Sequence, residues 1–339
     1  MPRAVRTDIV QPDGRHVYLY GALAPPPADY HAPSMPNGSY QRRWNPLRRE
    51  WVLVAASRQD RTFLPDRADC PLCPSRPGHS SEIPASHFEA AVFENRFPAM
   101  VPERPSGGVC EVVVYTEEHE GSFATLSAQQ LVRLAEVWTD RYRELVKRRA
   151  IRYVFIFENR GEPVGVTLHH PHGQIYGYPF VPPVAAAELR RQTLGCLQCR
   201  LIADELKGGR RVLINQGGIV AYVPGYARWP FEVHLATRAH RAALPALTPT
   251  SRQVLLSAMQ RIARAYDRLF QVPMPYMMAI HQAPTGRPGP QAHLHVEFYP
   301  VLRDKGKLKY LAGSESGAGV FINDTLAEES AGRLRALLE

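Results

Sequence analysis

The sequence predicts an α+β fold made of two fused units, each a mainly antiparallel sheet with an amphipathic helix packed on one face. Landmarks in the first part of the chain return later in the same order and at nearly constant spacing. Each copy contains one long helix with a single apolar face, and short turns separate its strands. The 339 residues, 45% of them hydrophobic, are enough for two cores.

Four landmarks carry the repeat, and their offsets lie between 121 and 126 residues. They are CPLC at 70–73 with CLQC at 196–199, EVVVYTEEH at 111–119 with EVHLATRAH at 232–240, YVFIF at 153–157 with YMMAI at 276–280, and HPH at 170–172 with HLH at 293–295. Coincidence among common residue types would not keep this order and spacing. We therefore interpret the chain as a duplication.

The predicted elements follow in order along the chain. Residues 1–40 are rich in Pro, Ala and Ser without sustained periodicity, so we expect a Pro/Ala-rich N-terminal extension there. A first unit then occupies 41–190 and a second unit 191–339, each with one amphipathic helix. The apolar faces of these helices carry Leu131, Leu134, Trp138, Tyr142 and Leu145 in the first unit, and Leu255, Met259, Ile262, Tyr266 and Leu269 in the second.

The net charge of +9 is compatible with a basic surface, with anionic substrates or with nucleic acid. Lys and Arg are scattered apart from short runs, which favours a solvated surface first, anionic substrates second and nucleic acid a distant third. No run approaches the roughly eighteen apolar residues of a membrane helix, and the first residues lack the apolar segment of a secretory signal. We therefore expect a cytoplasmic protein that binds neither membrane nor nucleic acid.

The cysteines predict metal binding. Zinc prefers four tetrahedral nitrogen or sulfur ligands, commonly a close pair plus two residues from elsewhere, and C-x-x-C pairs in a reducing compartment more often hold metal than form disulfides. The first pair, with His119 and one histidine of the later HHPHG cluster, gives such a set; two buried reduced thiols are the alternative. The five cysteines are the pairs Cys70/Cys73 and Cys196/Cys199, with Cys110 left over.

The HHPHGQ cluster predicts phosphorus chemistry. In an extended segment, residues i and i+2 point to the same face, so His170 and His172 project together while His169 points away. One of the pair can ligate metal while the other stays free, with Gly173 leaving room for a bulky group and Gln174 offering an uncharged donor. A neutral imidazole that faces a phosphate is a nucleophile for phosphorus.

Five stretches carry a resemblance to a known family: QRRWNPLRREWVLVAASRQDR at 41–61, FENRG at 157–161, HPHGQIY at 170–176, WPFE at 229–232 and FYP at 298–300. At these residues the chain resembles the galactose-1-phosphate uridylyltransferase family, in the histidine-triad superfamily. HPHGQ together with FENRG is highly specific. The resemblance implies two fused histidine-triad-like units, which agrees with the repeat.

The resemblance further implies a ping-pong uridylyl transfer. His172 would attack the α-phosphorus of UDP-glucose, expel glucose-1-phosphate and form a uridylyl-histidine, which galactose-1-phosphate then attacks. Gln174 would hydrogen-bond a non-bridging phosphoryl oxygen, at a position where related nucleotidyl hydrolases have a third histidine. The zinc ligands that the family implies are Cys70, Cys73, His119 and His170.

Substrate-binding residues are implied in the same way. They are Arg58 and Arg61 near the diphosphate, Leu72 and Phe93 at the uracil, Asn95 and Asn159 at ribose or phosphate, Thr167 where the family often has serine, and Lys309 and Glu315 in a segment that reaches the sugar of the partner's site in a homodimer. Ser314 and Phe321 depart from the family's pattern near this segment. The preferred hexose-1-phosphate therefore stays open.

The repeat and the resemblance disagree about a second metal. The repeat gives two thiolates and two imidazoles, which favour zinc in a closed structural site. Under this interpretation His295 takes the nucleophile's position and Glu297 that of Gln174, so the second unit keeps a metal without the chemistry. The two ligand sets are Cys196, Cys199, His240 and His293 from the repeat, and Glu188, His281, His295 and Glu297 from the resemblance, in which Glu297 stands where the family has a third histidine.

Two alternatives remain at the level of the sequence. HPHGQ specifies the chemistry more tightly than the base, so the chain could be another nucleotidyltransferase or phosphorylase of the superfamily, acting by adenylyl transfer or on a dinucleoside polyphosphate. From a different class, the charge and the two C-x-x-C pairs are compatible with a zinc-stabilised nucleic-acid binder. The sequence lacks the clustered basic stripe with interleaved aromatic residues that such binding favours.

Overall fold

A computed structural model describes residues 5–61, 63–103, 107–190, 195–286 and 292–338, and the chain divides into two compact units. The first comprises residues 1–156, 167–188 and 284–287, and the second comprises 157–166, 189–283 and 288–339. Strand β7 (Tyr153–Arg160) crosses from the first unit into the second at residue 157. None of the helices in the described ranges combines the length and apolar character needed to cross a membrane.

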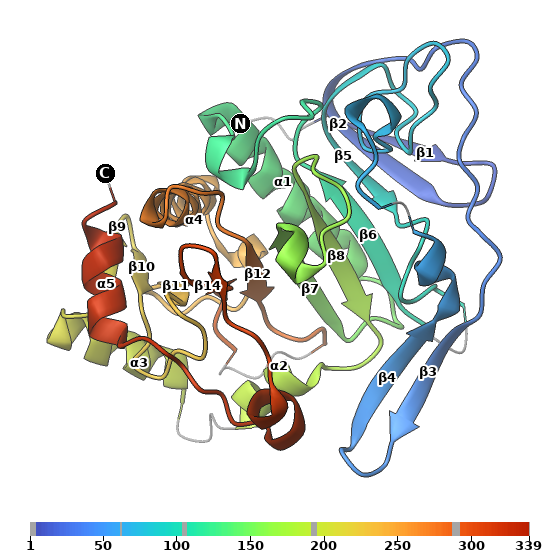
Figure 1. Ribbon diagram of the computed structural model, residues 1–339. Coiled ribbons are helices and arrows are strands. Elements are labelled where there is room, and N and C mark those ends of the chain that lie inside the picture. Colours follow the sequence, from blue (N-terminus) through green and yellow to red (C-terminus); the bar gives the residue numbers. More distant parts are fainter. Residues whose placement is uncertain (1–4, 62, 104–106, 191–194, 287–291, 339) are drawn as a thin grey trace. The chain divides into compact units, whose positions relative to one another are not determined.

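The first unit is built on an antiparallel sheet with helix α1 (Ala128–Leu145) against one face (Figure 1). The strand order is β1 (Arg6–Val10), β2 (His16–Ala24), β5 (His87–Glu94), β6 (Val109–Val114) and β8 (His172–Tyr178). A separate hairpin of β3 (Tyr40–Asn45) and β4 (Glu50–Ala55) stands apart from this sheet, and short helices η1 (Ala56–Asp60), η2 (Arg67–Asp69) and η3 (Phe123–Thr125) lie in its connections.

The prediction of an N-terminal extension up to residue 40 is wrong for residues 6–24, which form the strands β1 and β2. Val17 and Leu19 point to one face of the sheet and Tyr18 and Tyr20 to the other, and all four side chains are buried. A strand that is covered on both faces shows no alternation of apolar and polar residues. The sequence of β2 therefore lacks the alternation of apolar and polar residues that would have predicted a strand.

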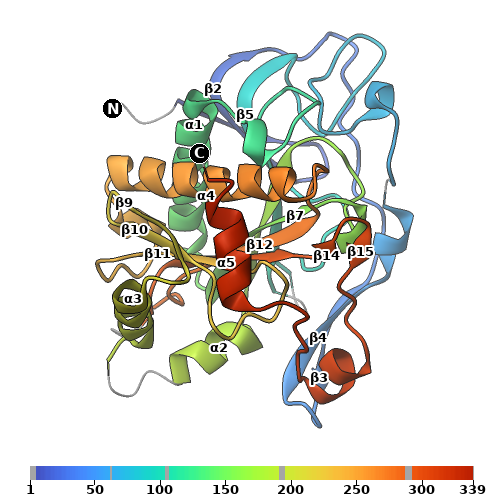
Figure 2. The same cartoon turned by 60° about the vertical axis from the view of Figure 1, so that its left-hand side comes forward.

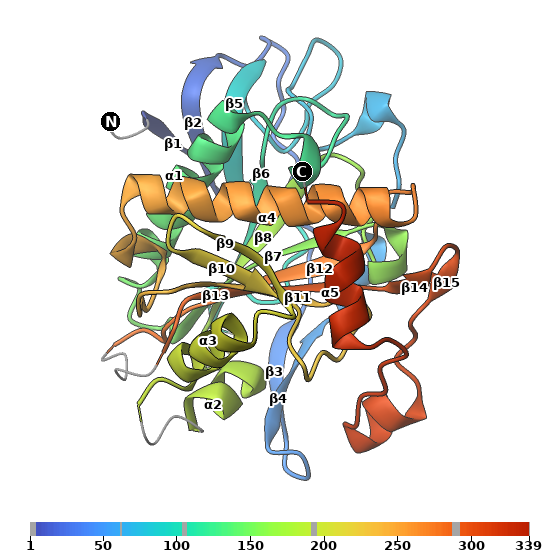
Figure 3. The same ribbon diagram turned by 90° about the vertical axis from the view of Figure 1, so that its left-hand side faces the viewer.

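The second unit repeats the plan with its own set of antiparallel strands, across which α4 (Pro249–Leu269) lies (Figure 3). Helix α5 (Ala327–Arg335) packs beside α4 and β9 (Figure 2). The strand order is β12 (Tyr276–His281), β13 (His295–Pro300), β11 (Val233–Thr237), β10 (Ile219–Tyr222) and β9 (Val212–Gln216). The remaining elements are η4 (Glu162–Val164), α2 (Pro183–Arg190), which runs from the first unit into the second, α3 (Leu197–Gly208), η5 (Leu244–Ala246), β14 (Leu302–Asp304), β15 (Lys307–Leu308) and η6 (Ser314–Ala318).

Both predicted amphipathic helices form. The side chain of Ser127 caps α1 and makes a capping box with Gln130, whereas Thr248 caps α4 and Pro249 occupies its first turn. All five apolar residues expected on the inner face of α1 are buried, and four of the five expected on α4 are buried, with Leu269 half-buried. The α+β prediction with mainly antiparallel sheets is therefore confirmed.

Strand pairing corrects the register of the repeat within β6 and β11. In the first unit Val112 lies opposite Gln174, and in the second unit His234 lies opposite Glu297. The structural counterpart of His234 is therefore Val112, whereas the alignment of the two sequence segments matches His234 with Val113. Glu111 and Glu232, which align as letters, have different contacts. Glu111 faces α1, whereas Glu232 accepts hydrogen bonds from its own turn and from His234.

A fully buried ion pair joins α1 to the first sheet. The guanidinium of Arg141 donates to both carboxylate oxygens of Glu111 at 2.6 and 3.0 Å, and it lies 3.7 Å from the ring centroid of Tyr18. The side chains are 1% and 0% exposed. Burial by itself lowers the pKa of Arg141, but the Glu111 carboxylate outweighs it and the pKa is raised.

We predict that Glu111→Ala destabilises the protein by about 3–5 kcal/mol, because it leaves the Arg141 guanidinium buried without a counter-charge. The double variant Glu111→Leu/Arg141→Met should lose much less of the free energy of unfolding, since no buried charge remains. Urea unfolding followed by circular dichroism measures both losses. Equal losses in the two variants would contradict the assignment of the cost to the unpaired charge.

Candidate active site and metal sites

The candidate nucleophile lies at the start of β8, on the sheet face opposite α1. Because alternate residues of a strand share a face, His172 and Gln174 point to the same side. Across the strands, one row on this face consists of Val17, Phe93, Val112 and Gln174, and the next row consists of Leu19, Ala91, Val114 and His172. His172 and Gln174 thus project from one half-buried patch beside an apolar surface.

One hydrogen bond sets the tautomer of His172. Its Nδ1 lies 2.7 Å from the backbone carbonyl oxygen of His170. A carbonyl oxygen can only accept, so Nδ1 carries the proton and Nε2 keeps its lone pair. Burial lowers the pKa of His172 below its usual value, which favours the neutral imidazole. The side chain is therefore prepared to act as a nucleophile through Nε2.

The structure brings together the four residues of the first predicted metal site. Their ligand atoms all lie within 4.8 Å of one another. His170 directs Nδ1 toward the sulfurs of Cys70 and Cys73, at 3.9 and 3.6 Å, and Cys73 lies 3.4 Å from Nδ1 of His119. The opposite nitrogen of His170, Nε2, donates to the carbonyl oxygen of Thr116 at 2.8 Å. This bond leaves Nδ1 unprotonated and able to bind a cation.

The donor set fits zinc. With zinc bonds of about 2.3 Å to sulfur and about 2.1 Å to nitrogen, a tetrahedral ion separates its sulfur and nitrogen ligands by about 3.6 Å. The three observed separations bracket this value. The hydrogen bond with Cys73 lowers the pKa of the Cys70 thiol well below its usual value, so one thiolate forms readily.

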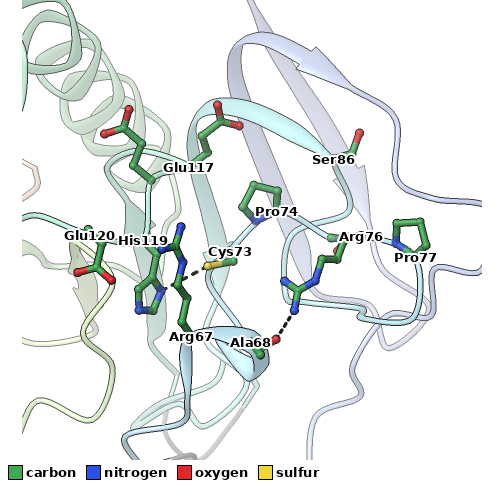
Figure 4. A pocket seen from close by; sticks show the side chains of 12 residues that line it. Arg67, Ala68, Cys73, Pro74, Arg76, Pro77, Ser86, Glu117, His119 and Glu120 are labelled. Carbon is green, nitrogen blue, oxygen red and sulfur yellow. Dashed lines mark hydrogen bonds between the residues drawn. The ribbon is translucent and has the colours of Figure 1, made fainter.

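An open pocket of about 940 Å³ reaches Cys73 and His119 of this cluster from the solvent. Figure 4 shows Cys73 and His119 facing each other on its wall, with Glu117 and Glu120 nearby. Neither His172 nor Gln174 belongs to its lining. The candidate nucleophile therefore lies outside this pocket.

The predicted uracil and phosphate residues of the first unit lie around the same sheet face. Leu72 and Phe93 belong to one buried cluster together with the cysteines of CPLC. The side chain of Asn95 accepts from the backbone N–H of Phe97, and Arg58 donates to the carbonyl oxygen of Phe97 at 2.8 Å. The side chains of Arg58 and Asn95 thus both hydrogen-bond to the backbone of Phe97.

The other predicted binding residues are more dispersed. Arg61 is exposed, and the half-buried Thr167 accepts a backbone bond from Leu64. Asn159 lies in the part of β7 that belongs to the second unit. Also in the second unit, Lys309 and Glu315 form a buried ion pair with each other at 2.5 Å.

The second unit gathers the four residues that the repeat predicts for its own metal. Both Cys196 and Cys199 lie 3.4 Å from Nδ1 of His293, and Cys199 lies 3.7 Å from Nδ1 of His240. As in the first unit, the remaining nitrogen of the buried histidine donates to a threonine carbonyl, here Thr237 at 2.9 Å. Burial lowers the pKa of His293 to about 4, so its ring is neutral. This donor set fits zinc equally well.

The three residues of the alternative set that belong to the second unit also lie together. His281 and His295 stack with ring centroids 4.8 Å apart, and their Nε2 atoms lie 3.6 and 3.5 Å from the Glu297 carboxylate. Glu188, the fourth member, belongs to the first compact unit. His234 also approaches Glu297, at 3.4 Å, although the sequence did not single it out. Strand pairing was the signal that could identify it.

Comparisons with known proteins give a consistent result. The family model for the N-terminal domain of galactose-1-phosphate uridyl transferase matches residues 101–182, and the C-terminal domain model matches residues 191–339. A galactose-1-phosphate uridylyltransferase of Thermotoga maritima is 36% identical over 315 residues, covering 86% of this chain and 97% of that protein. The Streptomyces lividans enzyme is 38% identical over 272 residues, covering 77% and 73%.

Solved structures agree with these matches. A uridylyltransferase structure superposes with a TM-score of 0.80 at 34% identity, covering 88% of this chain and 98% of that one. An ADP-glucose phosphorylase from Arabidopsis thaliana has the same fold, with a TM-score of 0.68 at 22% identity and coverage of 88% and 99%. The chain therefore belongs to the galactose-1-phosphate uridylyltransferase family.

Proposed function

We propose that this protein transfers a uridylyl group between UDP-glucose and galactose-1-phosphate through His172. The observation that carries the proposal is the hydrogen bond from His172 Nδ1 to the carbonyl oxygen of His170, which leaves the Nε2 lone pair on the same sheet face as Gln174. Family membership supports the same conclusion.

The proposed reaction has two displacements. His172 Nε2 attacks the α-phosphorus of UDP-glucose, a phosphorus–nitrogen bond forms, and the bond to the bridging oxygen breaks to release glucose-1-phosphate. A phosphate oxygen of galactose-1-phosphate then attacks the same phosphorus. The phosphorus–nitrogen bond breaks, UDP-galactose leaves and His172 returns to its neutral form.

Gln174 is proposed to stabilise the charge on the phosphoryl group. Its amide is an uncharged donor two residues from the nucleophile on the same face of β8. In the second unit the counterpart is Glu297, whose carboxylate would repel a phosphate and can donate nothing when ionised. This difference supports chemistry in the first unit alone.

The nucleotide pocket is proposed to be made by the buried residues Leu72 and Phe93, by Arg58, and by the turn of Asn95 to which Arg58 is hydrogen-bonded. We further propose that Arg61, Asn159 and Thr167 contribute phosphate or ribose contacts, and that Lys309 and Glu315 act on the sugar in a homodimer. A cytoplasmic location belongs to the same proposal, because reducing conditions keep the C-x-x-C pairs able to bind metal.

Zinc is proposed at both cysteine-containing clusters. In each cluster two thiols and two imidazoles lie within 4.8 Å of one another. When bound, zinc would supply a closed structural crosslink, since all four positions around it are taken by protein ligands. In the first unit this crosslink would join CPLC to the segment that carries His172.

We predict that UDP-glucose labelled in the uracil leaves label on the protein, stable in alkali and labile in acid as expected for a phosphohistidine-type bond. His172→Gly should take up none, because the attacking nitrogen is gone. Label accumulation in His172→Gly would show that another residue is the nucleophile. A faster release of glucose-1-phosphate from ADP-glucose than from UDP-glucose would instead identify an adenylyl transferase.

We predict two zinc ions per chain by elemental analysis, falling to one in Cys196→Ser/Cys199→Ser. That variant should unfold at a lower temperature, since it loses a crosslink, and should still label His172. Glu188→Ala is the matched test of the other ligand set and should keep both ions. An unchanged metal content in the double cysteine variant, with a loss in Glu188→Ala, would favour the alternative set.

A further inference from the structure

The turn between β1 and β2 carries a buried arginine with an unusual number of partners. The Arg15 side chain is 5% exposed, and its Nε donates to Asp13 at 2.7 Å. One terminal nitrogen donates to the Glu82 carboxylate at 2.8 Å and to the Glu94 carbonyl oxygen at 3.2 Å, and the other donates to the carbonyl oxygen of Pro33. The planar fork of a guanidinium is suited to joining several acceptors in this way.

Through Glu94, Arg15 acts on the turn that presents Asn95. The carbonyl that it binds belongs to the peptide bond joining Glu94 to Asn95. On the far side of Asn95, Arg96 forms an ion pair with the other oxygen of Glu82 at 2.9 Å. Both neighbours of Asn95 are therefore held by the same arginine–carboxylate group, and Arg15 and Asn95 line one pocket of about 420 Å³.

Through Glu82, Arg15 also acts on the loop that presents Leu72. The backbone N–H of Glu82 donates to the carbonyl oxygen of Pro71, within CPLC, at 3.0 Å. The same β1–β2 turn holds Glu82 a second time, since the amide of Gln11 donates to its carbonyl oxygen at 3.0 Å. The CPLC loop is thus linked to the N-terminal turn through Glu82.

We propose that Arg15 is a positioning residue for the nucleotide pocket, joining the turn of Asn95 to the loop of Leu72 through Glu82. The inference rests on the proposed function, because these two walls matter as a pair only if a nucleotide binds between them. Arg15 acts on the walls and takes no part in bond making. It therefore sets the affinity for the nucleotide and leaves the rate of the chemical step unchanged.

The buried charge of Arg15 is better explained by a role in positioning the pocket walls than by a contribution to the stability of the protein. Apolar side chains of similar volume generally stabilise a protein as well as a buried ion pair does or better, whereas hydrogen-bonded charges impose a specific geometry. Three of the four acceptors of the Arg15 fork, on Asp13, Glu82 and Pro33, lie in loops or turns, and the fourth is the carbonyl oxygen of Glu94, the last residue of β5. The Arg141–Glu111 pair provides a contrast, because it joins a helix to a strand on the opposite face of the same sheet.

Arg15→Lys tests the proposal, since lysine keeps the charge and loses the fork. We expect the Kd for UDP, measured by calorimetry, to rise about tenfold, equivalent to about 1.4 kcal/mol. The rate of His172 labelling at saturating UDP-glucose should stay within about twofold of the wild type, because an interaction made equally in ground and transition states changes KM alone. Glu82→Gln should move Kd in the same direction, which keeps the test valid if Arg15→Lys folds poorly.

Arg141→Lys is the matched control, as it makes the same exchange in a buried ion pair away from the pocket. It should lower the melting temperature and leave the Kd for UDP unchanged. If Arg15→Lys and Glu82→Gln also lower the melting temperature with an unchanged Kd, Arg15 is merely structural and the inference fails. A wild-type protein that neither binds UDP nor becomes labelled refutes the proposed function itself, and the inference with it.

Discussion

The contacts of a single residue, His170, connect the first cysteine–histidine cluster to the candidate nucleophile. Its ring directs Nδ1 at two thiols, its Nε2 donates to the Thr116 carbonyl oxygen, and its own carbonyl oxygen accepts from His172. The first two contacts hold the backbone at His170 in place, and the third uses that backbone to set the tautomer of the neighbouring imidazole. The cysteine–histidine cluster and the orientation of the candidate nucleophile are therefore linked through one short segment before β8.

The second unit preserves this arrangement of backbone bonds and changes the groups around it. His293 donates to Thr237 and accepts from His295 at 2.8 Å, as His170 does with its partners. Glu297 replaces the amide of Gln174, and its carboxylate is surrounded by histidines. Leu72 is the third residue of the first C-x-x-C segment, and its counterpart in the second segment is Gln198. The Gln198 amide donates to the Tyr222 hydroxyl at 3.0 Å. The second unit therefore keeps the cysteine–histidine cluster and has polar groups where the first unit has Leu72 and Gln174.

The N-terminal strands extend the first sheet, and the turn between them lines the pocket of about 420 Å³ that Asn95 also lines. The segment after β2 runs along the loop between CPLC and β5, where Asp29 accepts from Gly78 and the hydroxyl of Ser80 accepts from His31. Together with Arg15, these contacts attach a long loop, otherwise without regular structure, to the edge of a sheet. A loop stabilised in this way can present rigid walls to a ligand.

The sequence by itself determined the duplication, the two amphipathic helices and the residues of both cysteine-containing clusters. Helical periodicity, C-x-x-C spacing and the HPHGQ pattern are local, so they can be read without knowing which strands pair.

The tertiary structure alone decided that residues 6–24 belong to the sheet, because both faces of β2 are covered and its alternation is hidden. The tertiary structure also decided that His234 lies opposite Glu297. An alignment by letters would have placed Val233, the match of Val112, at that position. Register is set by hydrogen bonds between strands far apart in the chain, and a shift of one residue moves every side chain to the other face. The contacts of Arg15 were beyond the sequence for the same reason, since they join residues 67 and 79 positions away.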